Sequence, residues 1–341
     1  MKAIDALIIT SIAGDDNEAL RLYARECSKR GVHFIVIGDK KSPEGFSLEG
    51  CDYYNLAQQL SLPFQSSGSI PENSYARKNI GYLLAASKGY EVIAETDDDN
   101  FPMNNFWKKS SMQTSSYLIE NKGWINVYAY FTEKKIWPRA FPLEYVNDPV
   151  PAMDEFHYAD VISPVQQGLA NNNPDVDAVF RLVKILPIRF KNAPKVSLGA
   201  GTWCPFNSQN TRWFRPAFPL LYLPSYCSFR MTDIWRGFIA QRIFMTNGWS
   251  LLFHKPTVYQ ERNMHNIMKD FNDEIPGYLN NLMIVKSLES LALKSGESNI
   301  AENLVRCYES LINQGLVDEK EMDILHAWNN DMKDALRVMS N

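Results

Sequence analysis

The chain has 341 residues, of which 45% are hydrophobic and 22% are charged, and it carries a formal net charge of −4. This composition is typical of a soluble globular protein, and the negative charge argues against a nucleic-acid binder, which neutralises phosphates with Lys and Arg. No stretch approaches the roughly 18 uninterrupted apolar residues of a membrane-spanning helix, and the N-terminal residues lack a cleavable-signal pattern. The five cysteines are scattered without metal-ligand spacing, which favours reduced thiols. We therefore expect a cytoplasmic protein with one large domain and an appendage.

The first hundred residues alternate between short apolar strands and amphipathic helices. Strands are predicted over residues 6–10 and 33–37, with a helix over 15–30 between them. A second helix is predicted over 74–88 and leads into a strand over 91–95. Strands joined by helices indicate a parallel sheet with right-handed crossovers, but no GxGxxG follows the first strand, so a dinucleotide-binding fingerprint is absent.

The rest of the chain changes from a less regular α/β pattern to an all-helical one. The elements expected in the middle are strands over 124–131, 184–186, 196–198 and 249–253, a loop over 167–175 and a helix over 232–246. From about residue 274 onward, apolar residues recur at helical spacing, and helices are predicted over 301–314 and 319–339.

The most informative motif is the acidic run Asp97-Asp98-Asp99, directly after the predicted strand 91–95. Three adjacent like charges are unfavourable unless solvent or a cation compensates them, and ligands bind at strand ends in an open α/β sheet. Carboxylate oxygens suit Mg²⁺ or Mn²⁺, and such an ion can hold a diphosphate. For the bare motif a solvated acidic turn is the commoner explanation, so the surrounding sequence must decide.

Other polar residues stand where they could contribute to such a site. Asp39 and Lys40 follow the second predicted strand, where a carboxylate can bind a base or ribose and a lysine a phosphate; a surface turn explains them equally well. Arg77 and Lys78 precede the acidic run on a predicted helix and could balance a diphosphate, although a solvated helix face is more usual. Asp233 stands at a predicted helix start, where it either caps the helix or acts as a base in a cleft.

The later part of the chain adds weaker candidates. His254 and His265 follow the last predicted strand, and a histidine there could complete an oxygen-rich metal site, although a lone histidine is more often structural. Trp203 and Trp235 could stack on a sugar face, although core packing is the commoner fate of tryptophan.

Together these motifs resemble those of GT-A glycosyltransferases and, more narrowly, those of the STELLO glycosyltransferase family. The blocks that carry the resemblance are Gly38-Asp39 with Pro43, residues 73–82, Asp97–Asp99, Trp137-Pro138-Arg139, Pro142-Leu143, and residues 166–170, 174–178, 205–211, 230–237 and 241–242. They are ordered over about residues 5–265, and a set of this kind is far more specific than any one motif. A weaker similarity to reversibly glycosylated polypeptides, which act as UDP-arabinopyranose mutases, rests on the Gly-Tyr helix before the acidic run.

The resemblance implies an α/β fold with a GT-A-like, Rossmann-related mixed sheet flanked by helices and a C-terminal helical appendage. The implied domains are a glycosyltransferase domain over residues 1–273, with a nucleotide-binding half (1–105) and an acceptor half (106–273), and a helical extension over 274–341. The implied activity is metal-dependent transfer of a sugar from a nucleotide sugar, with a UDP-sugar favoured, to a hydroxyl group. Mn²⁺ or Mg²⁺ is the expected cofactor.

The resemblance also implies roles for individual residues. Asp233 is the expected catalytic base, which would make the reaction inverting. In a retaining reaction Asp233 would instead be a ligand of the acceptor or of the donor sugar, and the sequence does not choose between the two outcomes. The expected metal ligands are Asp97, Asp99 and His265. The expected donor and nucleotide site consists of Thr10, Asp39, Lys40, Arg77, Lys78, Asp97 and Asp98. The expected sugar or acceptor pocket consists of Asp175, Asp177, Asn207, Gln209, Asn210, Trp235 and Arg236.

Two other functions stay open at this point. One is a UDP-sugar mutase or a self-glycosylating protein, and the other is an inactive scaffold that binds nucleotide sugars. The acceptor is a carbohydrate, a lipid-linked group or a protein, and the sequence does not choose among them. We expect no nucleic-acid partner and no integral membrane segment, and the C-terminal helices offer a surface for oligomer formation.

Overall fold

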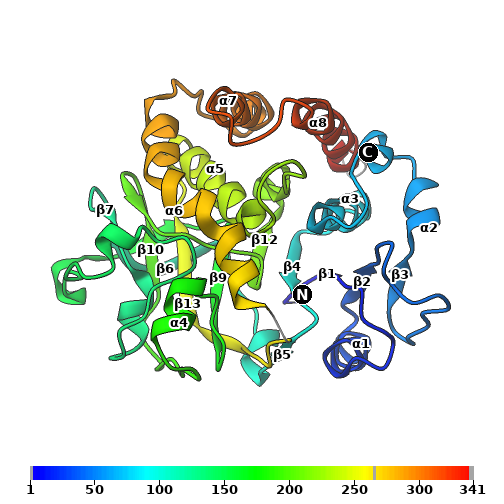
Figure 1. Ribbon diagram of the computed structural model, residues 1–341, viewed down its shortest axis with the longest axis horizontal. Coiled ribbons are helices and arrows are strands. Elements are labelled where there is room, and N and C mark those ends of the chain that lie inside the picture. Colours follow the sequence, from blue (N-terminus) through cyan, green and yellow to red (C-terminus); the bar gives the residue numbers. More distant parts are fainter. Residues whose placement is uncertain (1–2, 264–265, 338–341) are drawn as a thin grey trace.

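A mixed β-sheet forms the centre of the protein, whose computed structural model describes residues 3–263 and 266–337 (Figure 1). Its strands are β1 (Ala6–Thr10), β2 (His33–Ile37), β3 (Asp52–Tyr54), β4 (Val92–Thr96), β5 (Asn100–Pro102), β6 (Gln113–Ile119), β8 (Tyr158–Ile162), β9 (Val165–Asn171), β10 (Val196–Leu198), β12 (Asn210–Phe214) and β13 (Leu251–Gln260). Among the described residues this sheet has 11 strands in the order β3-β2-β1-β4-β12-β9-β13-β10-β6-β8, with β5 paired to β13. The short strands β7 (Gly123–Trp124) and β11 (Thr202–Trp203) pair separately.

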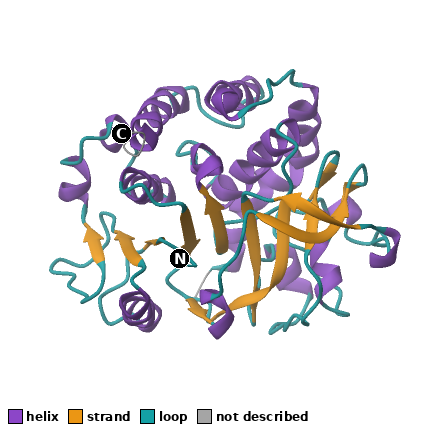
Figure 2. Ribbon diagram, turned by 180° about the vertical axis from the view of Figure 1, so that it is seen from behind, coloured by secondary structure: helices purple, strands orange, loops and turns teal. Residues whose placement is uncertain are grey.

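Helices cover the sheet on both sides (Figures 1 and 2). They are α1 (Glu18–Arg30), α2 (Leu56–Leu60), α3 (Lys78–Ser87), α4 (Ala178–Val183), α5 (Thr232–Thr246), α6 (Ile267–Ser290), α7 (Ile300–Asn313) and α8 (Glu321–Arg337). The first helix illustrates how local sequence sets these bounds. The Asn17 side chain accepts a hydrogen bond from the amide of Leu20, and Gly31 takes the left-handed conformation (φ 63°) that ends α1.

The N-terminal half has the parallel arrangement that the strand–helix alternation predicts. β3, β2, β1 and β4 are parallel, and β12 then pairs antiparallel with β4. After β1 the chain proceeds toward β2 and β3 on one side, whereas β4 lies on the other side. The ends of β1 and β4 therefore form a topological switch point, where open α/β sheets bind ligands.

Several predicted elements differ from the observed ones. Of the predicted strand 124–131, only Trp124 lies in a strand, as the last residue of β7, and Val127–Phe131 forms a 3₁₀ helix. Residues 184–186 form no strand, and Ile185 is 88% exposed. The predicted loop 167–175 is wrong in its first half, because β9 is buried between β12 and β13 and its polar side chains bond inside the sheet.

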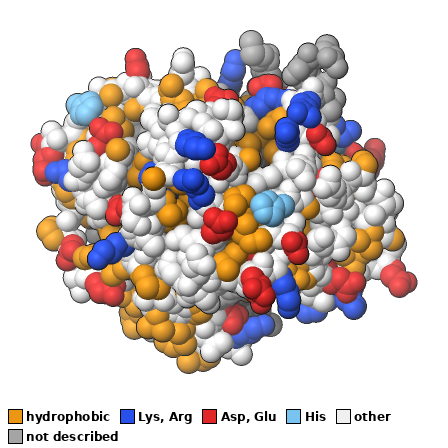
Figure 3. All heavy atoms as spheres, turned by 90° about the horizontal axis from the view of Figure 1, so that it is seen from above, with side chains coloured by type: hydrophobic (Ala, Val, Ile, Leu, Met, Phe, Trp, Pro, Cys, Tyr) orange, Lys and Arg blue, Asp and Glu red, His pale blue; other side chains and the backbone are white. Residues whose placement is uncertain are grey.

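The C-terminal helices pack onto the same hydrophobic core as the sheet. α8 packs against α3, and α7 packs against α5 and α8 (Figure 1). The Asp331 carboxylate of α8 accepts hydrogen bonds from the amides of Gln65 and Ser66, both at 2.8 Å, and from the Ser66 hydroxyl at 2.7 Å. The expected domain boundary between residues 273 and 274 falls inside α6. The face formed by the C-terminal helices carries acidic, basic and apolar side chains intermixed (Figure 3).

The expected α/β class, the mixed sheet flanked by helices and the C-terminal helices are confirmed. The observed architecture is consistent with the expected GT-A-like fold. Across the described residues, no helix combines the length and the apolar character needed to cross a membrane.

Candidate active site

The acidic run lies at the end of β4, at the switch point of the sheet. Its three carboxylates contact three different parts of the chain. The Tyr75 hydroxyl donates to Oδ1 of Asp97 at 2.8 Å, and the Ser11 hydroxyl donates to Oδ2 of Asp98 at 2.5 Å. The carboxylate of Asp99 accepts from Nε2 of Gln260 at 3.0 and 2.9 Å. These contacts fix the run in place instead of leaving it as a solvated turn.

Among the described residues, the positive charge that pairs with the acidic run comes from Lys78 and does not balance its three carboxylates. Burial raises the pKa of Asp97 to about 7, although the Lys78 ammonium, with Nζ at 3.6 Å from Oδ1 of Asp97, opposes the shift. Burial also raises the pKa of Asp98. Lys78 is itself fully buried and donates to the Thr96 carbonyl at 2.9 Å and to the Tyr75 hydroxyl at 2.8 Å. A further cation would therefore be favourable beside these carboxylates.

Two oxygens beside the acidic run bear on whether a divalent cation fits there. Thr10 Oγ1 and Asn100 Oδ1 are buried and have no hydrogen-bond partner among the residues that the structure describes. The parallel register pairs Ile8 with Glu95, so Thr10 at the end of β1 lies alongside Asp97. Within residues 3–263 and 266–337, no group of three or more His, Cys, Asp or Glu side chains is arranged to hold a metal ion. The oxygen donors thus fit an ion that is held jointly by one or two carboxylates and a substrate diphosphate. Mg²⁺ is often bound in this way, rather than in a site made of protein ligands alone.

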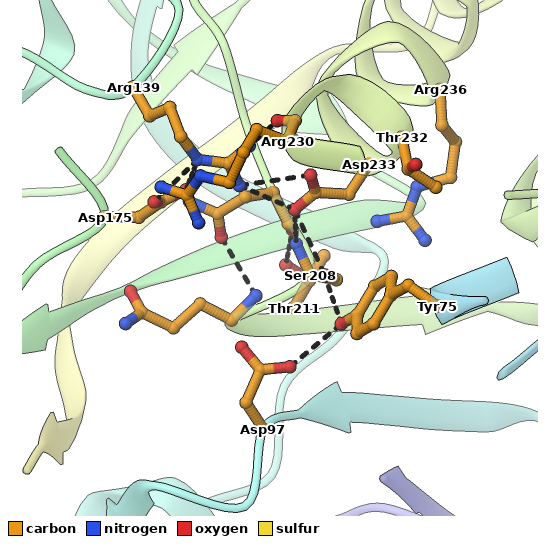
Figure 4. A network of polar contacts seen from close by, with 12 residues as sticks. Tyr75, Asp97, Arg139, Asp175, Ser208, Thr211, Arg230, Thr232, Asp233 and Arg236 are labelled. Atoms are coloured by element: carbon orange, nitrogen blue, oxygen red, sulfur yellow. Dashed lines mark hydrogen bonds and ion pairs between the residues drawn. The ribbon is translucent and has the colours of Figure 1, made fainter. Parts of the chain in front are cut away.

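A chain of hydrogen bonds leads from the acidic run to Asp233 (Figure 4). The Tyr75 hydroxyl, bonded to Asp97, also lies 2.6 Å from the Ser208 hydroxyl. Ser208 donates its backbone amide and its hydroxyl to Oδ2 of Asp233, both at 3.1 Å. Nη2 of Arg139 donates to both oxygens of Asp233 at 3.1 and 3.0 Å. The fold therefore joins two expected site residues, Asp97 and Asp233, that are far apart in the sequence.

Asp233 is a buried and ionised carboxylate. Burial by itself would raise the pKa of Asp233, but the charges of Arg139 and Arg236 and the amide of Ser208 outweigh it, and the pKa is lowered. The carboxylate is thus anionic and held in a fixed orientation near the acidic run. A lowered pKa also makes it a weak base, and its catalytic role stays a prediction.

The remaining donor-side candidates shape the surrounding loops. Asp39 accepts from the amides of Lys40, Asn73 and Ser74 at 2.7, 2.8 and 2.9 Å, which holds the turn before Tyr75. The buried Arg77 donates to Gln59 Oε1 at 2.7 Å and to the Ile70 carbonyl at 2.8 Å. Lys40 is exposed and pairs with Glu72 at 2.8 Å. Among the expected cations Lys78 contacts the acidic run, while Arg77 and Lys40 bond to neighbouring loops.

Three of the expected acceptor-side residues join the network around Arg139. Nε of Arg139 donates to the Asp175 carboxylate at 2.8 and 3.1 Å. The Asn207 side chain donates to Asp175 at 2.7 Å and accepts from the amide of Gln209 at 3.0 Å. These residues surround the position of Asp233.

The other acceptor-side candidates are structural in their observed contacts. Asp177 caps α4 through the amide of Phe180 and accepts from the Trp137 indole, both at 2.7 Å, and burial raises its pKa to about 7. Asn210 bonds to the Leu169 carbonyl at 3.0 Å and to the Thr257 hydroxyl at 2.8 Å, which joins neighbouring strands.

Trp235 and Arg236 point into the packed interior. The Trp235 indole donates to Asn281 at 3.1 Å, and Arg236 pairs with the fully buried Glu95 at 2.9 Å. Neither side chain has appreciable exposed surface to offer to a sugar. The expected ligand His265 lies outside the described residues, and His254 directs Nδ1 to the Lys255 carbonyl at 2.8 Å.

Sequence reasoning missed four residues that the geometry brings to the site. Tyr75, Ser208 and Arg139 carry the network, and all three stand in blocks that carry the resemblance. Phe229 is 59% exposed, and its ring lies edge-to-face with that of Tyr75 at 6.4 Å between centroids. No periodic signal marks Phe229, because it stands in a short 3₁₀ turn (Phe229–Met231) before α5.

Comparisons with known proteins identify the relatives of this chain. The model of the family described as STELLO glycosyltransferases matches residues 230–338. The probable glycosyltransferases STELLO1 and STELLO2 of Arabidopsis thaliana are each 28% identical to this chain over 347 residues, covering 95% of it. The chain is thus similar to STELLO-type glycosyltransferases. It spans 44% of the length of each of these two relatives.

The family match covers α5 through α8, so the similarity to STELLO glycosyltransferases includes the C-terminal helices. Among solved structures, the crystal structure of a mycobacterial protein aligns with 83% of this chain and 74% of that one. Its TM-score is 0.41 and its identity 9%, and nothing about function follows from it.

Proposed function

We propose that this protein is a metal-dependent glycosyltransferase that moves a sugar from a nucleotide sugar, with a UDP-sugar favoured, to a hydroxyl group. The observation that carries the proposal is the hydrogen-bonded connection between the acidic run and Asp233 through Tyr75 and Ser208. These hydrogen bonds join a cluster of carboxylates that favours a cation to a second, oriented carboxylate, which supports a shared site for donor and acceptor. The family relationship supports the same activity.

On the donor side, Asp97 and Asp99 would hold Mn²⁺ or Mg²⁺ together with the diphosphate. The bound ion supplies charge neutralisation for the leaving diphosphate. Lys78 lies 3.6 Å from Asp97 and adds a fixed positive charge on the same side. Tyr75 and Ser11 orient Asp97 and Asp98 through their hydroxyls.

On the acceptor side, Asp233 would take the proton of the acceptor hydroxyl as its oxygen attacks the anomeric carbon and the bond to the diphosphate breaks. Arg139 and Ser208 hold the carboxylate in one orientation, because they donate to both of its oxygens. The exposed ring of Phe229, beside Tyr75, offers a flat apolar surface for a sugar face, the role expected of Trp235. With Asp233 as the base, the reaction inverts the anomeric centre.

The first experiment measures nucleotide-sugar binding. UDP-, GDP- and TDP-sugars are screened for Mn²⁺-dependent thermal stabilisation, because a ligand that binds only the native state stabilises it by about 2.7 kcal/mol at 100 times its Kd. We expect stabilisation by one nucleotide class in the wild type and in the exposed-site control Asp148→Asn, and its loss in Asp97→Asn and Asp99→Asn. The absence of a shift with every nucleotide would contradict the proposal.

The second experiment measures turnover. Transfer should cease in EDTA and in Asp97→Asn, and full activity in EDTA would exclude the metal mechanism. Incubation of the UDP-sugar without an acceptor separates a transferase from a mutase, since only a mutase interconverts the ring forms of the free donor. A protein that binds UDP but neither transfers nor isomerises would be a scaffold.

A further inference from the structure

Three arginines gather where α4 packs against α6. Glu274 of α6 accepts from Arg230 Nε and Nη2 at 3.1 and 2.9 Å, and its other oxygen accepts from the amide of Ala178, at the start of α4, at 2.7 Å. One turn earlier on α6, Asp270 accepts from Arg262 Nη2 at 2.6 Å. Arg181 stands one turn after Ala178 on α4, which packs against α6. Arg181, Arg230 and Arg262 are called the arginine cluster below.

Arg181 differs from the other two arginines because, among the described residues, none of its nitrogens bonds to a carboxylate. Its Nη1 and Nη2 donate to the side-chain oxygen of Asn173 at 3.5 Å and to the Pro174 carbonyl at 3.2 Å, both neutral acceptors. Its Nε is buried and has no hydrogen-bond partner within the described part of the chain. Burial lowers the pKa of Arg181 to about 10, and the positive charges of Arg262 and Arg230 add to that effect, whereas the carboxylates of Asp175 and Glu274 oppose it. Carboxylates therefore act on the Arg181 guanidinium without a direct hydrogen bond to it.

The arginine cluster is connected to the candidate active site through Asn173, which accepts from Arg181. The Asn173 carbonyl accepts from Nε2 of Gln209 at 3.4 Å, and its side-chain amide donates to the Gln260 carbonyl at 3.3 Å. Gln260 in turn donates to the carboxylate of Asp99. Two side chains, Asn173 and Gln260, therefore connect Arg181 to the acidic run.

We propose that the arginine cluster binds an anionic group, a phosphate or a carboxylate, carried by the acceptor. The inference rests on the proposed transferase function and adds the chemical class of the acceptor. A planar guanidinium donates two parallel hydrogen bonds to either anion, and in the described structure Arg181 has an unused Nε donor and no directly bonded carboxylate. The donor diphosphate is assigned to the acidic run and Lys78, so the anion at the cluster belongs to the second substrate.

Inorganic phosphate is the binding probe, titrated calorimetrically into the protein saturated with UDP and Mg²⁺ so that the diphosphate position is filled. The variants are Arg181→Gln, Arg181→Lys and, as a matched control, Arg189→Gln at an exposed arginine beyond α4. We expect Arg181→Gln to weaken phosphate binding at least tenfold, Arg181→Lys to weaken it less, and Arg189→Gln to leave it unchanged. Equal phosphate affinity in the wild type and both Arg181 variants would overturn the proposal.

Acceptor assays then distinguish the source of the anion. Glucose 6-phosphate, glucuronate and glucose are compared as acceptors, and one of the two charged sugars should exceed glucose in kcat/KM in an Arg181-dependent manner. If glucose is as efficient an acceptor as both charged sugars, the inference is overturned while the transferase proposal stays intact. Conversely, if no nucleotide binds, phosphate is titrated into the nucleotide-free protein, and Arg181-dependent binding there would support the anion site and contradict the proposed function.

Discussion

Asp331 of α8 lies at the contact between the C-terminal helices and the first half of the chain. Its replacement by alanine measures how much this contact contributes to the free energy of unfolding. The carboxylate is 5% exposed and accepts from the amides of Gln65 and Ser66 and from the Ser66 hydroxyl. Ser66 is fully buried, so Asp331→Ala strands two of its donors, whereas the amide of the exposed Gln65 can bond to water. Each stranded buried donor costs about 1–3 kcal/mol, and rotation of the hydroxyl recovers part of it, so we expect a loss of about 2–4 kcal/mol.

The assay is thermal and urea unfolding followed by tryptophan fluorescence. An unfolding entropy of about 2.1 cal/mol/K per residue converts this loss into a decrease in Tm of about 3–6 °C. Ser66→Ala removes one donor without stranding another and should cost about 1 kcal/mol. The matched control Asp334→Ala, at an exposed position on the same helix, should stay within about 0.5 kcal/mol of the wild type. Equal unfolding of Asp331→Ala and Asp334→Ala would refute the coupling.

Two further predictions concern acid stability and the rim of the site. Burial, with the nearby charge of Arg212, lowers the pKa of His254 from 6.5 to about 4, so the folded state binds fewer protons than the unfolded state between these values. The free energy of unfolding should therefore decrease as the pH falls from about 6.5 to 4, by at most about 3 kcal/mol from this group. His254→Gln should flatten the dependence of stability on pH in this range, whereas the exposed-site control His326→Gln should not. Parallel curves for His254→Gln and the wild type would contradict this prediction. Phe229→Ala should raise the KM for the sugar that stacks on it roughly 2–12-fold, as about 0.5–1.5 kcal/mol of aromatic contact implies, while the equally exposed Met268→Ala should leave KM unchanged. Equal KM values in the two variants would exclude a stacking role.

The sequence by itself was sufficient for features that depend on local periodicity. The strands 6–10, 33–37 and 91–95, the helices between them, the position of the acidic run at a strand end and the two last helices agree with the structure to within a few residues, whereas β3 and α2 were not predicted. Such elements are encoded within windows of about ten residues, because side-chain spacing and caps act over that range. β9 escaped prediction because its Gln and Asn residues are satisfied by strands on both sides, a condition that local sequence does not contain.

Which candidate residues face each other was decided by the tertiary structure. Asp233 is paired with Arg139, 94 positions earlier in the chain, and Asp39 bonds to backbone amides 34 and 35 positions away. Trp235 is buried because α5 is enclosed by neighbouring elements, and the stacking position then belongs to Phe229, at the exposed turn before it. Contacts between distant segments depend on how complete elements pack. Residue types and motifs therefore located the region of the site, whereas the tertiary structure determined which residues form it.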